Sequence, residues 1–434
     1  MDRMRHAKAR GLAIVAAAIA CLSLAAGCSP DSPSSGGVAL DTSGTGPITF
    51  AVGADDAQFF TKLIGPWNKA HPGEHVTIQL LPEAANGQLA QLTASLQAGL
   101  PTDDVIDMDV VWTAEFASAG WIIPLSANTF PVGEFLRPAV DTAMYDGRLY
   151  AVPDYSNADL LYFRKDILAR AGLSAPRTWA QLEKDADTIA PRYGLQGYAG
   201  QFQQYEGLTV NFADAVQSAG GSILSPNDAG VSVNSPEALK GLDFLVDGLR
   251  AGWITKSSLT FEEESSKNDF ESGKLLFLNN WPFVWNDVSQ PGPGNKVYGK
   301  VGVAPLPGLT GPGSSSLGGA NLAVSAYSQH QRTAIAFIKY LTSEPEEEQM
   351  LADSGFPPVW TQLYSDPALI RRFPYLPVVK RAILRAQPRP SITDYDQASL
   401  VISSDVYQAL TFRETPKEAL AQMSSQLSQI IRDG

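Results

Sequence analysis

Cysteine is nearly absent from this chain, which has two cysteines among 434 residues. Cys21 and Cys28 both lie near the N-terminus, so the rest of the chain has no thiol with which to form a disulfide. We therefore expect the folded part to be stabilised by packing alone. Histidine is also scarce, with four residues, and no cysteines or histidines have the spacing of a zinc site. The sequence predicts no metal and no other cofactor.

An excess of basic residues is also missing. The 32 lysines and arginines face 45 aspartates and glutamates, which gives a net charge of −13. Such an acidic chain is poorly suited to nucleic acids, whose phosphates attract positive charge. The chain contains no HExxH, GxSxG or Walker-type phosphate loop, which are signatures of three large classes of hydrolase. We expect a protein that is not an enzyme and does not bind nucleic acid.

Long apolar runs are missing except near the N-terminus. Arg3, Arg5, Lys8 and Arg10 form a basic head in front of the apolar run 11–24. That run is too short to span a bilayer of about 30 Å as a stable helix, so it is typical of a cleaved export signal.

Small residues close this signal ahead of a cysteine. Ala25, Ala26 and Gly27 precede Cys28, and this pattern predicts a lipoprotein signal peptide over 1–28, with Cys28 as the acylated new N-terminus. An ordinary secretory signal, or cleavage near Cys21, is the alternative. Residues 29–46 are rich in Ser, Gly and Pro and predict a flexible tether. We expect a protein that is lipid-anchored to the cell membrane on its extracytoplasmic side.

About 390 residues follow the tether, which is more than a single core usually fills, so we expect two lobes. Strands and helices alternate at the start of this part, which predicts an α/β fold with a largely parallel sheet. The first predicted elements are strands 48–52, 76–81 and 104–110 and helices 57–71 and 89–100. Ligands gather at the carboxyl ends of such strands, which places Asp109, Val111 and Trp112 at the edge of a cleft.

The chain then crosses between lobes more than once. Residues 149–164 form an extended crossing, and the segment from about 156 to 285 predicts a mainly helical second lobe. Strand character returns at 301–305 and 318–325, and helices follow from Gln331. The expected N-terminal lobe comprises 47–153 plus about 289–323, and the C-terminal lobe comprises 154–288 plus about 324–434.

Six segments occur in the same order as in a known family. They are Asp-Val-Val-Trp-Thr-Ala-Glu-Phe-Ala from Asp109, Gly-Trp-Ile-Ile-Pro-Leu from Gly120, the crossing 149–164, Phe-Glu-Ser-Gly-Lys from Phe270, Asn-Trp-Pro-Phe from Asn280 and Gly-Gly-Ala-Asn from Gly318. Together they resemble the extracellular solute-binding proteins of carbohydrate-importing ABC transporters, of the maltose-binding type. The resemblance implies a two-lobed, periplasmic-binding-protein-like α/β fold, with a ligand cleft between the lobes.

The resemblance also implies partners. The protein would capture a sugar by closure of its lobes and deliver it to permease subunits in the membrane, with a separate cytoplasmic ATPase, and we expect it to be a monomer.

Segments 109–117, 280–284 and 407–410 are most similar to the trehalose-binding lipoproteins of mycobacterial importers, which implies a disaccharide, trehalose. Another oligosaccharide of the maltose type is the alternative. A membrane-anchored carbohydrate-active enzyme is a further one, with Asp109 and Glu263 as its carboxylate pair. A surface adhesin is disfavoured by the α/β lobes.

A sugar site needs charged and amide groups at its edges and aromatic rings against the faces of the sugar. Asp109 is expected to accept bonds from paired hydroxyls, or else to cap the helix over 113–119. Asn157 would match a vicinal diol, or else make a turn. Gln88 is the weaker candidate and would otherwise be a surface amide.

The second lobe supplies the remaining polar candidates. The resemblance places Glu206 and Glu263 near the cleft, although Glu263 belongs to an acidic triplet that is equally typical of a solvated helix start. It also implies that Arg413 clamps the sugar with its planar fork of donors. Glu414 offers a competing surface pair for this arginine.

Aromatic and glycine residues complete the predicted site. Trp281 and Phe283 flank Pro282, which prevents a regular helix and leaves both rings free to form a stacking platform. A place in the core is the alternative for these rings. Gly319 would let the backbone approach the sugar closely, or else form a bulge or turn.

Overall fold

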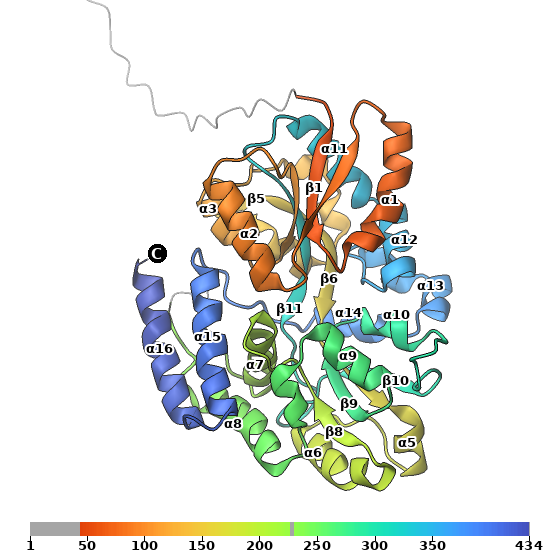
Figure 1. Cartoon of the computed structure of the whole chain (residues 1–434), viewed down its shortest axis with the longest axis vertical. Coiled ribbons are helices and arrows are strands. Elements are labelled where there is room, and N and C mark those ends of the chain that lie inside the picture. The colour runs from red at the N-terminus through yellow and green to blue at the C-terminus, as the bar shows by residue number, and fades with distance from the viewer. Residues whose placement is uncertain (1–43, 226–229, 434) are drawn as a thin grey trace, which may run out of the picture. The chain divides into compact units, whose positions relative to one another are not determined.

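The computed structural model describes residues 44–225 and 230–433. The predicted signal peptide, Cys28 and most of the predicted tether therefore lie outside the described residues. The described chain forms two β-sheets that are each flanked by helices, together with a small two-stranded sheet (Figure 1). The α/β fold is confirmed. Within residues 44–225 and 230–433, no helix is both long enough and apolar enough to cross a membrane.

The first sheet has the strand order β2-β1-β3-β11-β6. Its strands are β1 (Ile48–Gly53), β2 (Val76–Leu81), β3 (Val105–Asp109), β6 (Ala151–Ala158) and β11 (Leu317–Val324). Strand β1 runs parallel to β2 and β3, whereas β11 runs antiparallel to both β3 and β6. The prediction of a largely parallel sheet is right for the first three strands and wrong for β11, which returns from the second sheet in the opposite direction.

Helices surround this sheet because their apolar residues recur at helical spacing. In α1 the buried residues are Ala57, Phe60, Leu63, Ile64 and Trp67, which form one face. The helices of this region are α1 (Ala57–Ala70), α2 (Ala85–Gln97), α3 (Thr113–Ser118), α4 (Arg137–Thr142), α11 (Gln331–Leu341), α12 (Glu344–Ser354), α13 (Pro367–Arg372) and α14 (Leu376–Ile383). Helix α10 (Val284–Val288) lies in the chain between two strands of the second sheet. The short hairpin of β4 (Met144–Tyr145) and β5 (Arg148–Leu149) lies between α4 and β6 in the chain.

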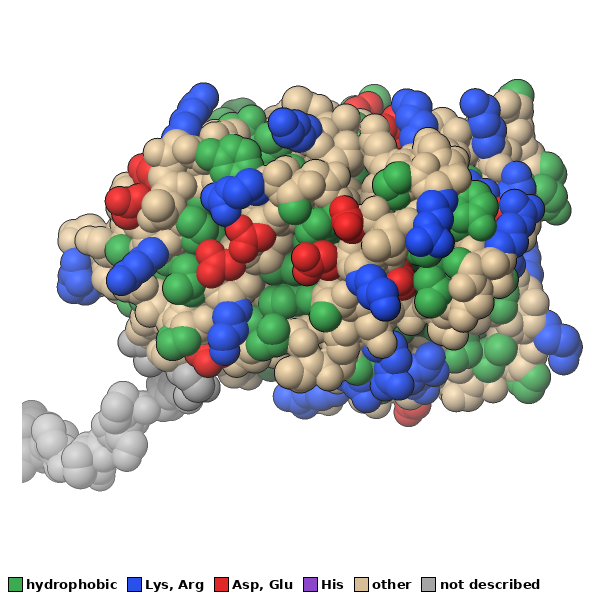
Figure 2. Space-filling view, turned by 90° about the horizontal axis from the view of Figure 1, so that it is seen from below, with side chains coloured by type: hydrophobic (Ala, Val, Ile, Leu, Met, Phe, Trp, Pro, Cys, Tyr) green, Lys and Arg blue, Asp and Glu red, His purple; other side chains and the backbone are tan. Residues whose placement is uncertain are grey.

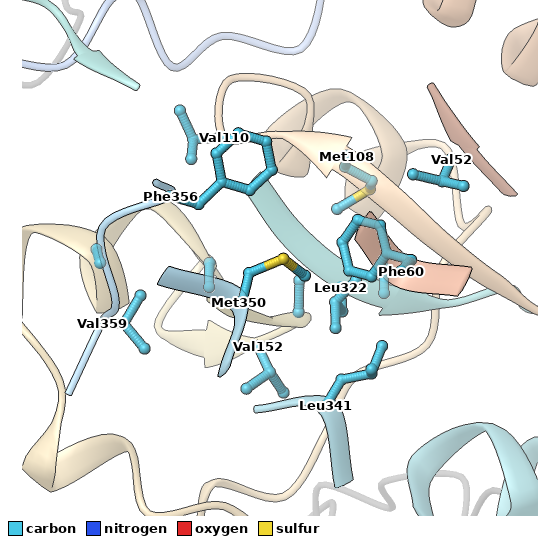
Figure 3. Close-up of a cluster of buried hydrophobic side chains, with 14 of the residues drawn as sticks. Val52, Phe60, Met108, Val110, Val152, Leu322, Leu341, Met350, Phe356 and Val359 are labelled. Atoms are coloured by element: carbon cyan, nitrogen blue, oxygen red, sulfur yellow. The ribbon is translucent and has the colours of Figure 1, made fainter. Parts of the chain in front are cut away.

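The core of the first sheet joins elements from both ends of the chain. Figure 3 shows Val52, Met108 and Leu322 from three strands together with Phe60 of α1 and Met350 of α12. The ring of Phe50 packs edge-on against Phe60 at 5.0 Å and against Phe337 of α11 at 5.7 Å. Helices α11 and α12 therefore belong to this core, although residues after about 324 were expected in the other lobe.

The second sheet has the order β10-β7-β9-β8, and all of its strands except β10 lie in the part of the chain expected to be mainly helical. Its strands are β7 (Leu160–Arg164), β8 (Gln196–Ala199), β9 (Leu275–Asn280) and β10 (Val301–Pro305). Strand β10 pairs with β7, so it lies in the second sheet and not in the N-terminal lobe as expected. The neighbouring helices are α5 (Lys165–Arg170), α6 (Trp179–Thr188), α7 (Glu206–Ser218), α8 (Pro236–Ala251), α9 (Glu263–Glu271), α15 (Tyr395–Leu410) and α16 (Pro416–Asp433).

Three segments carry the chain from one sheet to the other. The first is the junction of β6 and β7 at Asp159, the second joins β10 to β11, and the third joins α14 to α15. The first two meet where the backbone N–H of Asp159 donates to Ser315 Oγ at 2.6 Å. The second and third meet at the bridge between Ser316 and Gln387. The expectation of more than one crossing is confirmed.

Gly319 of β11 sits in a backbone conformation that other residues avoid, with φ of +122°. A Cβ at this position would collide with the carbonyl oxygen of Tyr155 in β6. The glycine is therefore needed for close packing of two strands in an irregular stretch of sheet.

We expect Gly319→Ala to lower the free energy of unfolding by about 2–4 kcal/mol, because backbone strain and a collision add together. Gly147→Ala is the matched control, since its φ is +71° and an added Cβ meets nothing within 4 Å. That variant should lose only about 1–2 kcal/mol. Urea unfolding measures both, and equal losses would contradict the role of the collision.

Candidate binding cleft

A cavity of about 650 Å³ lies where the ends of the two sheets face each other. Its volume is within the roughly 300–1,000 Å³ that is typical of small-molecule sites. The carboxyl ends of the parallel strands contribute Asp55 after β1, Glu83 after β2 and Asp109 at the end of β3. This is the placement that the strand order predicts. Trp112 also lines the cavity as expected, whereas Val111 is not among its lining residues.

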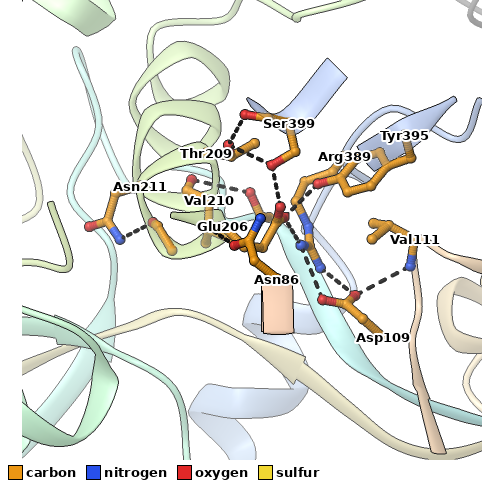
Figure 4. Close-up of polar contacts among 12 residues, drawn as sticks. Asn86, Asp109, Val111, Glu206, Thr209, Val210, Asn211, Arg389, Tyr395 and Ser399 are labelled. Carbon is orange, nitrogen blue, oxygen red and sulfur yellow. Dashed lines mark hydrogen bonds and ion pairs between the residues drawn. The ribbon is translucent and has the colours of Figure 1, made fainter. Parts of the chain in front are cut away.

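The centre of the cleft is a buried ion triad. Arg389 Nη2 lies 2.7 Å from Asp109 Oδ1, and Arg389 Nη1 donates to Glu206 Oε1 (Figure 4). The side chain of Arg389 is 2% exposed. Asp109 belongs to the first sheet and Glu206 begins α7 beside the second, so one guanidinium connects the two sides of the cleft.

Asp109 does not cap a helix as the alternative supposed. The cap position of α3 is Trp112, and no side chain provides a cap hydrogen bond there. Asp109 instead accepts from Arg389 and, at 3.3 Å, from the backbone N–H of Val111. Burial alone would lower the pKa of Arg389, but Asp109, Tyr395 and Glu206 raise it well above its ordinary value. The guanidinium therefore stays charged and holds both carboxylates in place.

Glu206 has further partners around the triad. Its carboxylate accepts from Tyr395 Oη at 2.5 Å and from Ser399 Oγ, both on α15. Its backbone N–H donates to Asn86 Oδ1 of α2 at 2.8 Å, which is a second contact across the cleft. The positive end of the helix dipole favours a negatively charged side chain in the first turn of a helix, and Glu206 occupies this position in α7.

Asn157 and Gln88 both line the cavity. Asn157 lies within strand β6 rather than in a turn, and its buried Oδ1 has no hydrogen-bond partner among the described residues. Gln88 is half-buried on α2, where its Nε2 donates to the carbonyl of Glu83 at 3.1 Å. This unpaired Oδ1 atom of Asn157 can accept a hydrogen bond from a hydroxyl group.

Glu263 lines the opposite side of the cavity at the start of α9. It accepts a hydrogen bond of 2.7 Å from Tyr205 Oη, so it is not a solvated member of an acidic run. Burial raises the pKa of Glu263 to about 7.

The predicted aromatic platform is present. Trp281 follows the end of β9 directly, and Phe283 lies two residues later; both line the cavity. The ring of Trp281 lies against Gly318 of β11, where an added Cβ would be 2.7 Å from its Cη2 atom. Phe283 faces the ammonium of Lys267, which is 5.6 Å from the ring centroid. Gly318 therefore makes room for an aromatic ring.

The prediction for Arg413 is wrong about its position. Arg413 follows α15 on the exposed surface, where its Nη1 is 3.5 Å from Gln408 Oε1, and it is not among the lining residues. The arginine of the cleft is Arg389, which the sequence reasoning missed. Pro388 and Pro390 flank it, and two prolines around one arginine predict an extended segment that holds this side chain rigidly. Gly319 does line the cavity, but its backbone packs against Tyr155.

The fold and the cleft agree with comparisons to known proteins. Residues 51–348 match the family model described as bacterial extracellular solute-binding protein. The chain belongs to this family. A protein of Deinococcus radiodurans named "Probable ABC transporter-binding protein" is 30% identical over 373 residues, which cover 82% of this chain and 87% of that one.

Other members of the solute-binding family carry more specific names. The "Mannitol-binding protein" of Pseudomonas aeruginosa is 26% identical, with 80% of each chain covered. A solved structure titled "Maltose bound T. maritima MalE3" has a TM-score of 0.84 and 32% identity, and covers 88% of this chain and 99% of that one. The two-lobed fold expected from the resemblance is thereby confirmed. These relatives are solute-binding proteins and not enzymes, as expected for this chain.

We expect Arg389→Met to lower the free energy of unfolding by about 3–5 kcal/mol, because it leaves the buried carboxylate of Glu206 and the half-buried one of Asp109 without a counter-charge. The control is Arg413→Met, which removes the same group from the surface and should change stability by no more than about 0.5 kcal/mol. Urea unfolding at pH 7 compares them. Equal, small losses would show that the triad does not hold the cleft together.

The pKa of Glu263 predicts a pH dependence of stability. Between its ordinary value of 4.5 and about 7, the folded protein holds a proton on Glu263 that the unfolded chain has lost. Wild-type stability therefore falls as pH rises through this range, and Glu263→Gln should lack this fall. We expect the variant to gain about 1–3 kcal/mol relative to wild type between pH 4.5 and 7.5, measured by urea unfolding. Glu183→Gln on exposed surface is the control, and no relative gain would contradict the assignment.

Proposed function

We propose that this protein is the sugar-binding subunit of an ABC importer, which captures a disaccharide in the cleft and delivers it to a membrane permease. The observation that carries the proposal is a cavity of about 650 Å³ that combines a rigid charged centre with an aromatic wall. The names of relatives support a polyhydroxylated ligand, since they include a mannitol-binding and an arabinooligosaccharide-binding protein.

The lining has the chemistry that sugars require. The carboxylates of Asp109 and Glu263 accept hydrogen bonds from hydroxyls, and Asn157 offers a free acceptor. Trp281 provides an apolar face for the C–H side of a sugar ring. We infer that Arg389 positions Asp109 for this contact, because its two terminal nitrogens, Nη1 and Nη2, are already bonded to carboxylates.

Contacts across the cleft support capture by closure. Arg389 and the hydrogen bond from Glu206 N–H to Asn86 both join elements of the two sheets. A ligand that touches both sides is bound most tightly when the two sides are together, so it shifts the population toward the closed state. The permease would recognise this state, and ATP hydrolysis by a separate cytoplasmic subunit would separate the lobes.

Trehalose and the membrane anchor are parts of this proposal that rest on sequence. Segments 109–117, 280–284 and 407–410 support trehalose through their similarity to mycobacterial trehalose-binding lipoproteins. The signal and Cys28 support a lipid anchor on the extracytoplasmic side, which would keep a monomeric protein near its permease and raise its effective concentration. Maltose is the second candidate ligand, because MalE3 was solved with maltose bound.

Isothermal titration calorimetry with trehalose, maltose, sucrose and glucose tests the proposal. We expect saturable binding of trehalose, with the sugar recovered unchanged. Tighter binding of maltose would support the importer function and would make maltose, instead of trehalose, the ligand. A folded protein that binds none of the four would overturn the disaccharide assignment.

The Trp281→Ala variant tests the aromatic wall in the same assay. Loss of stacking should weaken sugar binding at least tenfold, about 1.4 kcal/mol, with little change in thermal stability. Trp121→Ala is the control, because Trp121 is also half-buried but packs against Phe116 outside the cavity. That variant should lose stability and keep its affinity, and the reverse pattern would place Trp281 in the core.

A further inference from the structure

The cavity is far more acidic than its function as a sugar site requires. Ten carboxylates line it, against the two basic residues Arg389 and Lys267. The acidic residues are Asp55, Asp56, Glu83, Asp107, Asp109, Glu206, Glu262, Glu263, Glu264 and Asp287. On the face shown in Figure 2, by contrast, lysine and arginine side chains are widely spread and acidic ones form small groups. Ten carboxylates against two basic side chains thus concentrate negative charge in this cavity, in a chain whose net charge is −13.

Both basic residues of the lining are already paired. Arg389 contacts Asp109 and Glu206. Lys267 Nζ lies 2.6 Å from Glu264 Oε2 and 2.6 Å from Asp287 Oδ2. Among the described lining residues, the remaining carboxylates have no ion pair with a basic side chain. Repulsion among them is relieved by protonation or by a cation that enters with the ligand.

Asp107 is the clearest example of a cavity carboxylate that has no ion pair with a described residue. It lies in β3, lines the cavity and is 6% exposed. Its Oδ1 atom is buried and has no hydrogen-bond partner among the described residues. Burial, followed by the nearby carboxylates of Asp154, Asp56 and Asp55, raises the pKa of Asp107 well above its ordinary value. A buried carboxylate oxygen without a partner is costly, and a charged donor would remove that cost.

Aromatic rings stand beside this carboxylate. Tyr155 is stacked on Phe356 with ring centroids 4.4 Å apart, and Phe59 meets Phe356 edge-on at 5.6 Å; all three line the cavity. Burial and then the nearby carboxylates of Asp56 and Asp107 raise the pKa of Tyr155, and all three residues line the same cavity. Carboxylates next to aromatic faces are the surroundings that bind an ammonium group, through ion pairing and cation–π attraction.

We propose that Asp55, Asp56 and Asp107, beside Tyr155 and Phe356, form a subsite for a protonated amino group, so that the protein prefers amino sugars to the corresponding neutral sugars. This inference rests on the proposed sugar-binding function and specifies its ligand class. The same charge should exclude sugar phosphates and sugar acids, because an anion would meet repulsion from the unpaired carboxylates.

Calorimetry with chemically matched ligands tests the subsite in the wild-type protein. The probes are trehalose, its 2-, 4- and 6-amino-deoxy derivatives, trehalose 6-phosphate, and glucose against glucosamine. We expect at least one amino derivative to bind ten or more times tighter than its parent sugar, and the phosphate not to bind. Salt should reduce the advantage of the amine, since ion pairing is screened.

Single substitutions test whether Asp107 is responsible for the preference for amino sugars. Asp107→Asn keeps the shape of the side chain and removes its charge, so the ratio of amine to parent affinity should fall at least fivefold. Asp187→Asn, on the exposed surface away from this cavity, should leave the ratio unchanged. Thermal unfolding checks that each variant is folded, and the wild-type comparison does not depend on them.

The outcomes separate the two proposals. If trehalose or another sugar of the panel binds and every amino derivative binds no more tightly than its parent, the subsite is overturned and the sugar-binding function stands. If neutral sugars bind weakly and an amino sugar binds tightly, the subsite is supported and trehalose is replaced as the ligand. If no sugar and no amino sugar binds, both proposals fail.

Discussion

The buried guanidinium of Arg389 is the constraint on which the cleft depends. A charge that is 2% exposed is tolerated only where opposite charges surround it, and those charges come from β3 and from the start of α7. Three separate segments must therefore meet at one point before any of them is stable there. Because Arg389 lies on the third crossing segment, it is positioned by the connection between the lobes and not by either sheet alone.

Much of the fold was predictable because it is local. The apolar spacing of α1 and the alternation of β2 are properties of short stretches, and the predicted bounds agree closely with those observed. Which strands pair with each other, by contrast, depends on residues that are far apart in the sequence. The sequence of β10 says that it is a strand, but its pairing with β7 depends on where the second crossing brings it. The lobe assignment therefore went wrong for residues 301–305, whereas residues 317–323 lie in β11 of the first sheet as expected.

The same distinction explains the site. Asp109 and Trp281 could be found because each follows a strand end, where side chains reach a cleft. Arg389 follows no strand, and its role depends on two carboxylates far away in sequence. Arg413 was placed by resemblance, and its neighbours Thr411 and Phe412 turn the chain outward after α15, where Phe412 has a positive φ. The need for Gly319 comes from a neighbouring strand, which sequence spacing does not reveal.

The glycine behind Trp281 has a consequence for how such a cleft changes its ligand during evolution. Trp281 extends from the second sheet, yet its ring rests on the backbone of Gly318 in the first. A single methyl group at Gly318 would push the ring away from β11 and reshape the cavity, although no residue with a polar contact to the ligand would have changed. A substitution at Gly318, which lies behind the aromatic wall, can thus change the size of ligand that fits the cavity. Selection can alter this position while the buried ion triad is kept.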